Sequence, residues 1–144
     1  MTAKIAYEDV EVGTELPAAS FPVDRAALVR YAGASGDFNP IHWSERIAKQ
    51  VGLDDVIAHG MFTMAEAIRV VTDWTGDPGA VVEYGVRFTN PVVVPDDDKG
   101  TAVEVAAKVA AKLDDEARTV RVDLTATSGG RKVLGMARAV VRLA

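Results

Sequence analysis

The chain has 144 residues, of which 49% are hydrophobic and 26% charged, and it contains no cysteine. This composition is typical of a folded globular domain and excludes a disordered or fibrous chain. Lys and Arg number 16 against 21 Asp and Glu, and the resulting net charge of −5 argues against a general nucleic-acid binder. The lack of cysteine excludes a disulfide framework, a cysteine nucleophile and a thiolate zinc site. Only two histidines, His42 and His59, remain for acid-base chemistry near neutral pH.

We expect one domain over residues 1–144, located in the cytoplasm. The first 13 residues carry no apolar run of signal-peptide length. Charged residues interrupt every apolar stretch well before the roughly 18–20 residues that a membrane span needs. The sequence therefore predicts neither a membrane nor nucleic acid as a partner.

Three helices are predicted in the first half of the chain. The first covers residues 24–31 and ends before Gly33, and the second covers 45–51 and is followed by Gly52. The longest covers residues 60–74, where apolar side chains occupy most of the helix circumference. A narrow polar stripe on this helix consists of Thr63, Glu66, Arg69 and Asp73. Such a helix is expected to be buried on most sides.

The second half alternates between apolar and polar residues, which predicts strands. Residues 80–95 are expected to form a strand pair, and residues 101–113, 119–127 and 132–143 one strand each. The long helix and the antiparallel strands together predict an α+β domain in which a curved sheet wraps the helix.

Residues 33–42 contain the side chains with the clearest chemical potential. Asp37 and His42 are five positions apart, which on a helix would separate them by about 140°. Gly36 and Pro40 instead favour a bent loop, which could direct a carboxylate and an imidazole into one cavity for paired acid-base work. The same composition is also typical of an ordinary turn.

The segment from Ser35 to His42 resembles the signature of the MaoC-like (R)-specific enoyl-thioester hydratases, whose fold is a single hot dog. The resemblance continues through four further segments, which are residues 58–61, 76–80, 83–84 and 86–88. Within this family the chain is most similar to the catalytic subunit of the actinobacterial (3R)-hydroxyacyl-ACP dehydratases, which pairs with a non-catalytic hot dog partner.

The resemblance implies hydration of trans-2-enoyl thioesters, or dehydration of (3R)-hydroxyacyl thioesters, carried by ACP or CoA. Asp37 would take a proton from water while His42 delivers one to C2, and Asn39 would steady the loop. The backbone N–H of Gly60 would meet the thioester carbonyl, where a helix N-terminus stabilises negative charge. No cofactor and no metal is implied.

Three further residues are candidates for substrate binding. His59 precedes the long helix and could act as a second acid or base, although a histidine that braces the loop is the commoner arrangement. Trp43 and Met61 could line the pocket, but packing accounts for such side chains first.

Two other kinds of site are disfavoured by the sequence. Residues 33–36 begin like a serine hydrolase nucleophile elbow, but Asp37 stands where the last glycine belongs. A metal site would have to draw on residues without a recognised ligand spacing, namely His42, His59, Asp37, Asp54 and Asp55.

Two alternative functions share the predicted fold: a non-catalytic subunit of a hot dog heterodimer, and an acyl thioesterase. A homodimer or a heterodimer with a second hot dog subunit is expected, because one copy leaves a sheet edge open. Candidate basic residues for an acidic carrier protein are Arg131, Lys132, Arg138 and Arg142.

Overall fold

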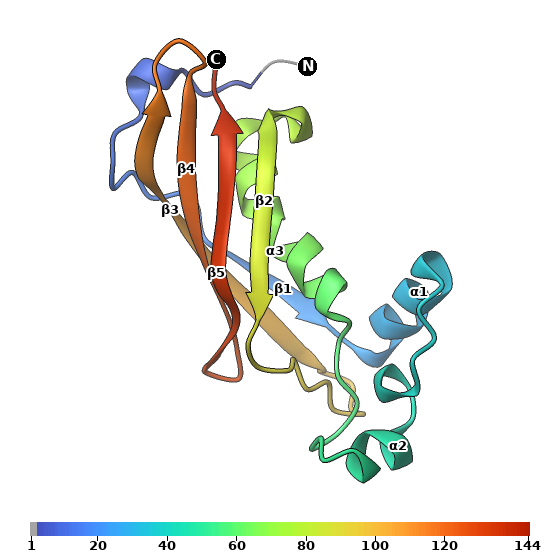
Figure 1. Ribbon diagram of the computed structural model, residues 1–144. Helices are drawn as coiled ribbons and strands as arrows, with labels where there is room; N and C mark the ends of the chain where they lie inside the picture. The colour runs from blue at the N-terminus through green and yellow to red at the C-terminus, as the bar shows by residue number, and fades with distance from the viewer. Residues whose placement is uncertain (1–2) are drawn as a thin grey trace.

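The computed structural model describes residues 3–144 as one antiparallel sheet, three α-helices and three short 3₁₀ helices (Figure 1). The strand order across the sheet is β1-β3-β4-β5-β2. The strands are β1 (Ala19–Val23), β2 (Val81–Phe88), β3 (Thr101–Asp114), β4 (Thr119–Ser128) and β5 (Arg131–Arg142). The α-helices are α1 (Arg25–Ser35), α2 (Glu45–Gln50) and α3 (Gly60–Thr75), and the 3₁₀ helices are η1 (Tyr7–Asp9), η2 (Pro40–His42) and η3 (Pro78–Ala80).

The core lies between α3 and one face of the sheet. Alternation on β4 places four apolar side chains on that face, each at most 5% exposed: Val120, Val122, Leu124 and Ala126. Helix α3 contributes Ala67, Val70 and Val71 to the same core. The predicted α+β class is thereby confirmed, as is the strand over residues 101–113, whose helix-like composition yields to its period-two burial.

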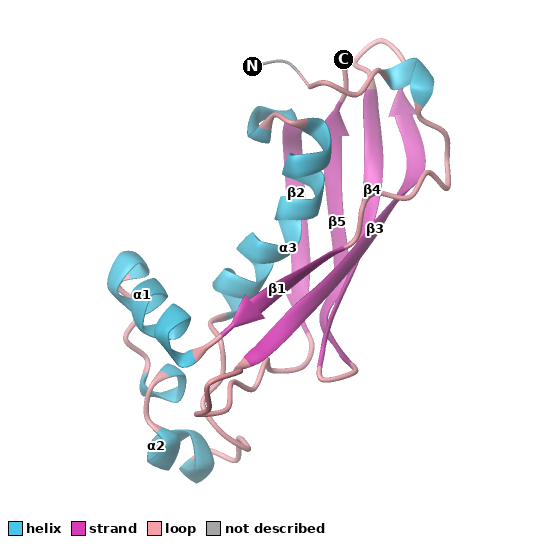
Figure 2. Ribbon diagram, turned by 180° about the vertical axis from the view of Figure 1, so that it is seen from behind, coloured by secondary structure: helices cyan, strands magenta, loops and turns pink. Residues whose placement is uncertain are grey.

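Helices α1 and α2 lie beyond one end of the sheet, beside the start of α3 (Figures 1 and 2). We call residues 24–58, which include both helices and η2, the overhang. Arg25 joins the overhang to the rest of the protein, because its Nε donates to the Val94 carbonyl at 2.7 Å. The same guanidinium contacts the carboxylates of Glu45 and Asp55 at 3.2 and 3.0 Å.

The structure corrects two of the predicted elements and adds one strand. Helix α1 runs through Gly33 and ends at Gly36, whose φ of +75° gives the left-handed cap. Residues 80–95 are not a strand pair, because only β2 forms and the chain then leaves the sheet as a loop that contains Pro91 and Pro95. Strand β1 was missed, since its five residues are too short to show a clear alternation.

Helix α3 agrees with its predicted bounds but not with its predicted polar stripe. Thr63 is 3% exposed, and its hydroxyl donates to the His59 carbonyl at 3.4 Å. Met61, by contrast, is 57% exposed. In the part of the chain that the structure describes, none of the helices is long and apolar enough to span a membrane.

Gly100 offers a direct test of this fold. It has φ +64°, and a Cβ there would overlap the Val23 carbonyl oxygen, whereas Gly130 has φ +74° and open space around its Cβ position. Left-handed backbone costs an alanine about 1–2 kcal/mol at either position. Gly100→Ala should lower the free energy of unfolding by about 1–3 kcal/mol more than Gly130→Ala, because only there must the backbone move. Urea denaturation measures the difference, and equal losses would contradict the close approach.

Candidate active site

Hydrogen bonds between residues two positions apart fix the shape of the loop after α1. The Ser35 hydroxyl accepts from the Asp37 N–H at 3.2 Å, and the Asp37 carboxylate accepts from the Asn39 N–H at 3.1 Å. The Asn39 side chain in turn accepts from the Ile41 N–H at 3.2 Å and caps η2. These side-chain turns replace a regular ladder, and they leave Asp37 exposed at the surface of the loop.

Two histidine rings lie face to face beneath this loop. The rings of His42 and His59 are 3.7 Å apart between centroids and are inclined by 22°. His42 Nδ1 lies 2.7 Å from the Ile57 carbonyl oxygen, and His59 Nε2 lies 3.0 Å from the Asp37 carbonyl oxygen. A carbonyl oxygen can only accept, so both of these ring nitrogens carry hydrogen. In its neutral form His42 therefore presents an unprotonated Nε2.

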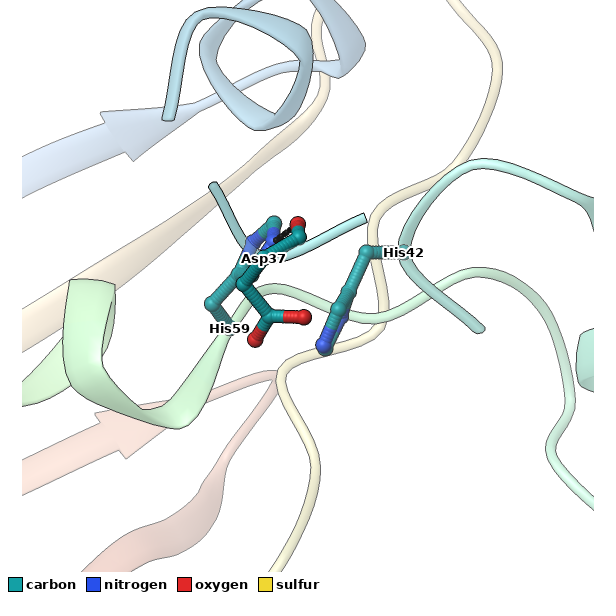
Figure 3. Close-up of side chains that lie close together, drawn as sticks. All are labelled: Asp37, His42 and His59. Carbon is teal, nitrogen blue, oxygen red and sulfur yellow. Dashed lines mark hydrogen bonds between the residues drawn. The ribbon is translucent and has the colours of Figure 1, made fainter. Parts of the chain in front are cut away.

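The Asp37 carboxylate is turned toward the His42 ring (Figure 3). Asp37, His42 and His59 each offer one side-chain atom, and these atoms lie within 4.8 Å of one another. His42 is 8% exposed and His59 1% exposed, so of the three residues only Asp37 is exposed to solvent. The structure thus brings together the carboxylate and the imidazole that the sequence pattern singles out.

Burial lowers the pKa of His42 below its usual value of 6.5, and the neighbouring His59 lowers it further. The Ile57 carbonyl and the Asp37 carboxylate act in the opposite direction, because both stabilise the imidazolium. The net result is a His42 ring that favours the neutral form at pH 7.

Helix α3 begins at Gly60, directly beside the histidine pair. The cap residue His59 makes no side-chain hydrogen bond to the first turn, whereas Asp24 caps α1 and Ser44 caps α2. The first-turn N–H groups of α3 therefore lack the side-chain acceptor that the other two helices have. Positive charge at this helix end favours an oxygen that gains negative charge.

A cavity of about 320 Å³ connects these groups. His42 and Gly60 line one part of it, and Thr89, Asn90 and Val133 line another. Phe88 forms part of the wall so close to Gly60 that a Cβ on Gly60 would lie 2.9 Å from the Phe88 ring. A side chain at this position would therefore force the Phe88 ring to shift.

Asp37 and the other predicted residues are not among the residues that line this cavity. Trp43 is 58% exposed, and its indole N–H donates to the Phe38 carbonyl at 3.0 Å. Met61 is on the exposed side of α3, and His59 lies behind the Asp37 loop. Asn39 is in the loop itself and acts on its shape.

Sequence reasoning missed three contributors to the site. Tyr31 packs against His59 with ring centroids 4.8 Å apart, and Ile57 supplies the carbonyl that holds His42. Phe88 belongs to a segment that carries the family resemblance, and this signal could have identified it. A backbone carbonyl such as that of Ile57 leaves no trace in residue types.

The cluster of Asp37, His42 and His59 is poorly arranged for a metal ion. Imidazole lone pairs lie in the ring plane, and two nearly parallel rings 3.7 Å apart direct them along similar lines rather than to one point. One nitrogen of each ring is also occupied by a backbone carbonyl. The arrangement is better suited to proton transfer between the carboxylate and His42 Nε2.

Comparison with known proteins agrees with this architecture. Residues 9–127 match the MaoC like domain family. The chain is 35% identical over 130 residues to the 3-hydroxybutyryl-CoA dehydratase of Methylorubrum extorquens, covering 89% of this chain and 78% of the relative. It is 43% identical over 79 residues to the 3-hydroxyacyl-thioester dehydratase X of Mycobacterium tuberculosis, covering 55% of this chain and 27% of the relative. A solved MaoC-like dehydratase has a TM-score of 0.94 at 44% identity, covering 99% of this chain and 43% of that one.

The chain belongs to the MaoC-like domain family, and the expected hot dog fold is confirmed. It spans about a quarter of the Mycobacterium tuberculosis relative, at 27%, and less than half of the solved MaoC-like dehydratase, at 43%.

The pKa of His42 can be measured by NMR titration of its ring protons. We expect a midpoint below 6.5, and a still lower one in Asp37→Asn, which removes a charge that stabilises the imidazolium. The exposed Asp54→Asn serves as the matched control and should leave the midpoint unchanged. Because the unfolded chain binds this proton more tightly, the His42 contribution to stability is lost as pH falls from about 6.5 through the folded pKa. A midpoint above 6.5 would contradict the buried site.

Proposed function

We propose that this chain hydrates trans-2-enoyl thioesters, and in reverse dehydrates (3R)-hydroxyacyl thioesters, by acid-base catalysis. One observation carries the proposal: His42 and the uncapped N-terminus of α3 line one cavity, and the Asp37 carboxylate lies within 4.8 Å of a His42 ring nitrogen. The names of two relatives support it, since both describe dehydratases of 3-hydroxy thioesters.

The proposed hydration transfers both hydrogens and the oxygen of one water molecule. The Asp37 carboxylate accepts one proton as the water oxygen bonds to C3, and the electrons of the double bond shift toward C2 and the carbonyl. The proton then passes from Asp37 to His42 Nε2, since side-chain atoms of the two residues lie within 4.8 Å of each other. The imidazolium formed in this way donates the proton to C2, which returns both groups to their resting forms.

Dehydration runs the same transfers backwards. Neutral His42 takes the C2 proton through Nε2 and passes it to the Asp37 carboxylate, which supplies it to the 3-hydroxyl group as water leaves. The lowered pKa of His42 serves both directions, because it keeps the resting ring unprotonated and makes the imidazolium a stronger acid.

Charge that reaches the thioester oxygen is stabilised by the start of α3. We propose that the Gly60 N–H donates to this oxygen, where the helix dipole also favours negative charge. Asn39 supports the reaction through the loop, and His59 through its bond to the Asp37 carbonyl. Met61 and Trp43, both exposed beside the site, are proposed to contact the rest of the thioester.

Substitution of the two proton-transfer groups tests the proposal. Asp37→Asn and His42→Gln should each lower kcat for crotonyl-CoA hydration by about 10²–10⁴-fold. The kcat of the double variant should be only slightly lower than that of the less active single variant, because the two groups act as a unit. The assay follows loss of the ultraviolet absorbance of the conjugated thioester, with Asp54→Asn as control. Full activity of either single variant contradicts the mechanism.

The same samples separate the alternative functions. Release of free thiol without loss of the double bond would identify a thioesterase. Hydration only after addition of a second hot dog subunit, and unaffected by either substitution, would identify a non-catalytic subunit.

We further propose that the protein assembles with a second hot dog subunit, identical or different, through β2. This strand is one edge of the sheet, so one row of its backbone groups has no partner strand within residues 3–144. Val82 and Phe88 on β2 are 51% and 55% exposed. Phe88 also lines the cavity, so a partner on this edge would border the site.

A charge on the β2 edge should weaken this assembly. Val82→Asp is expected to raise the dissociation constant at least about tenfold, since a buried carboxylate at an interface is unpaired. Val29→Asp, at a residue 65% exposed on α1, is the matched control. Sedimentation velocity measures both, and a monomeric wild type would overturn a homodimer and leave a different partner chain as the remaining form.

A further inference from the structure

The turn between β4 and β5 is tied to the cavity wall by three hydrogen bonds. Asn90 Nδ2 donates to the Lys132 carbonyl at 2.7 Å, and the Thr89 hydroxyl donates to the same oxygen at 3.0 Å. The Arg131 guanidinium donates to Asn90 Oδ1 at 2.7 Å. The Asn90 amide thus binds both the Lys132 carbonyl and the Arg131 side chain, at the residues where the turn enters β5.

This network lies at the cavity that holds the proposed reaction centre. Thr89 and Asn90 are lining residues of the same cavity as His42 and Gly60. Figure 1 shows the β4–β5 turn at the end of the sheet where β2 ends and α3 begins. A ligand that reaches His42 and leaves the cavity past Asn90 therefore meets Arg131.

Arg131 and Lys132 carry free positive charge at this rim. Among residues 3–144, neither has a carboxylate oxygen within 4.0 Å, whereas Arg138 lies 4.0 Å from Asp123. Arg142 pairs with Thr119 at the other end of β5. The four basic residues of β5 are thus not one patch, and only Arg131 and Lys132 are hydrogen-bonded to residues that line the cavity. In a chain with net charge −5, such a local excess favours an anion.

We propose that Arg131 and Lys132, held by Asn90, bind the phosphate of the pantetheine arm that carries the acyl group. This inference rests on the proposed function. A pantetheine arm has neutral amides along its length, and its phosphate is the first charge beyond the thioester in both CoA and a carrier protein. A guanidinium matches phosphate geometry with paired N–H donors, and Asn90 already fixes one of its nitrogens.

The test uses three crotonyl thioesters that differ in the carrier: CoA, 4′-phosphopantetheine and pantetheine. Crotonyl-phosphopantetheine and crotonyl-pantetheine differ by one phosphate and separate its contribution from everything else. Arg131→Gln keeps an N–H donor for Asn90 and removes the charge, and Lys132→Gln removes the second charge. Arg142→Gln on the same strand is the matched control.

We expect the Arg131→Gln, Lys132→Gln double variant to raise KM about fivefold or more for the two phosphorylated thioesters, with kcat unchanged. KM for crotonyl-pantetheine should not change, and Arg142→Gln should behave as wild type. Salt should raise the wild-type KM for crotonyl-CoA more than that of the double variant, because it screens the charges. A crotonyl group on holo carrier protein should show the same dependence on Arg131.

Equal changes for phosphorylated and unphosphorylated thioesters would overturn the proposal, as would no change for either. A dependence on CoA that crotonyl-phosphopantetheine lacks would also overturn it, because the adenosine phosphates would then be recognised. If wild type hydrates none of the three, the proposed function fails. Calorimetric titration with 4′-phosphopantetheine and with pantetheine still decides the phosphate site, which requires that phosphopantetheine bind more tightly to wild type than to the double variant.

Discussion

The site depends first on the bond from the buried His59 ring to the Asp37 carbonyl, at 3.0 Å. The loop that holds Asp37 belongs to no helix or strand and lies in the overhang beyond the sheet, so it needs an anchor from the core. His59 supplies this anchor and also stacks on His42, and the next residue begins α3. One side chain therefore sets the loop, the imidazole and the helix end relative to one another, which explains why it is almost fully buried.

Arg25 is the second constraint on the overhang. Its guanidinium binds groups from three segments, the Val94 carbonyl and the carboxylates of Glu45 and Asp55. The side chain is only 22% exposed, so these partners replace water around a charge that would otherwise be costly to bury. Because Asp55 lies two residues before Ile57, the same network steadies the carbonyl that binds His42.

The sequence predicts those parts of the molecule that depend on periodicity and on local chemistry. The long helix and the three strands over residues 101–113, 119–127 and 132–143 follow from the spacing of apolar residues. The loop from Asp37 to His42 follows from Gly36, Pro40 and the family resemblance. Strand β1 could not be predicted, because it forms only through its pairing with β3. Gly33 looked like a helix end, but the left-handed cap needs the positive φ found at Gly36.

The predicted site was less complete than the fold for a related reason. Residue types identify Asp37 and His42, but the histidine stack and the Ile57 carbonyl depend on how distant segments pack. The basic residues of β5 show the same limit. The sequence offers all four as candidates for one basic patch, yet Arg131 and Arg142 lie at opposite ends of the strand, and it is Arg131 that donates to Asn90.

Gly60 affects the proposed chemistry through packing as well as through its N–H. Any Cβ there would lie 2.9 Å from the Phe88 ring, so glycine allows β2 to approach the start of α3 and close the cavity wall. Most of that wall is apolar, and hydrogen bonds to a developing charge are stronger where apolar groups replace water. In the proposed mechanism the contact between Gly60 and Phe88 therefore affects both the position and the strength of the helix donors. A larger side chain at position 60 would leave the N–H in place and still weaken it, because Phe88 would have to move and admit water.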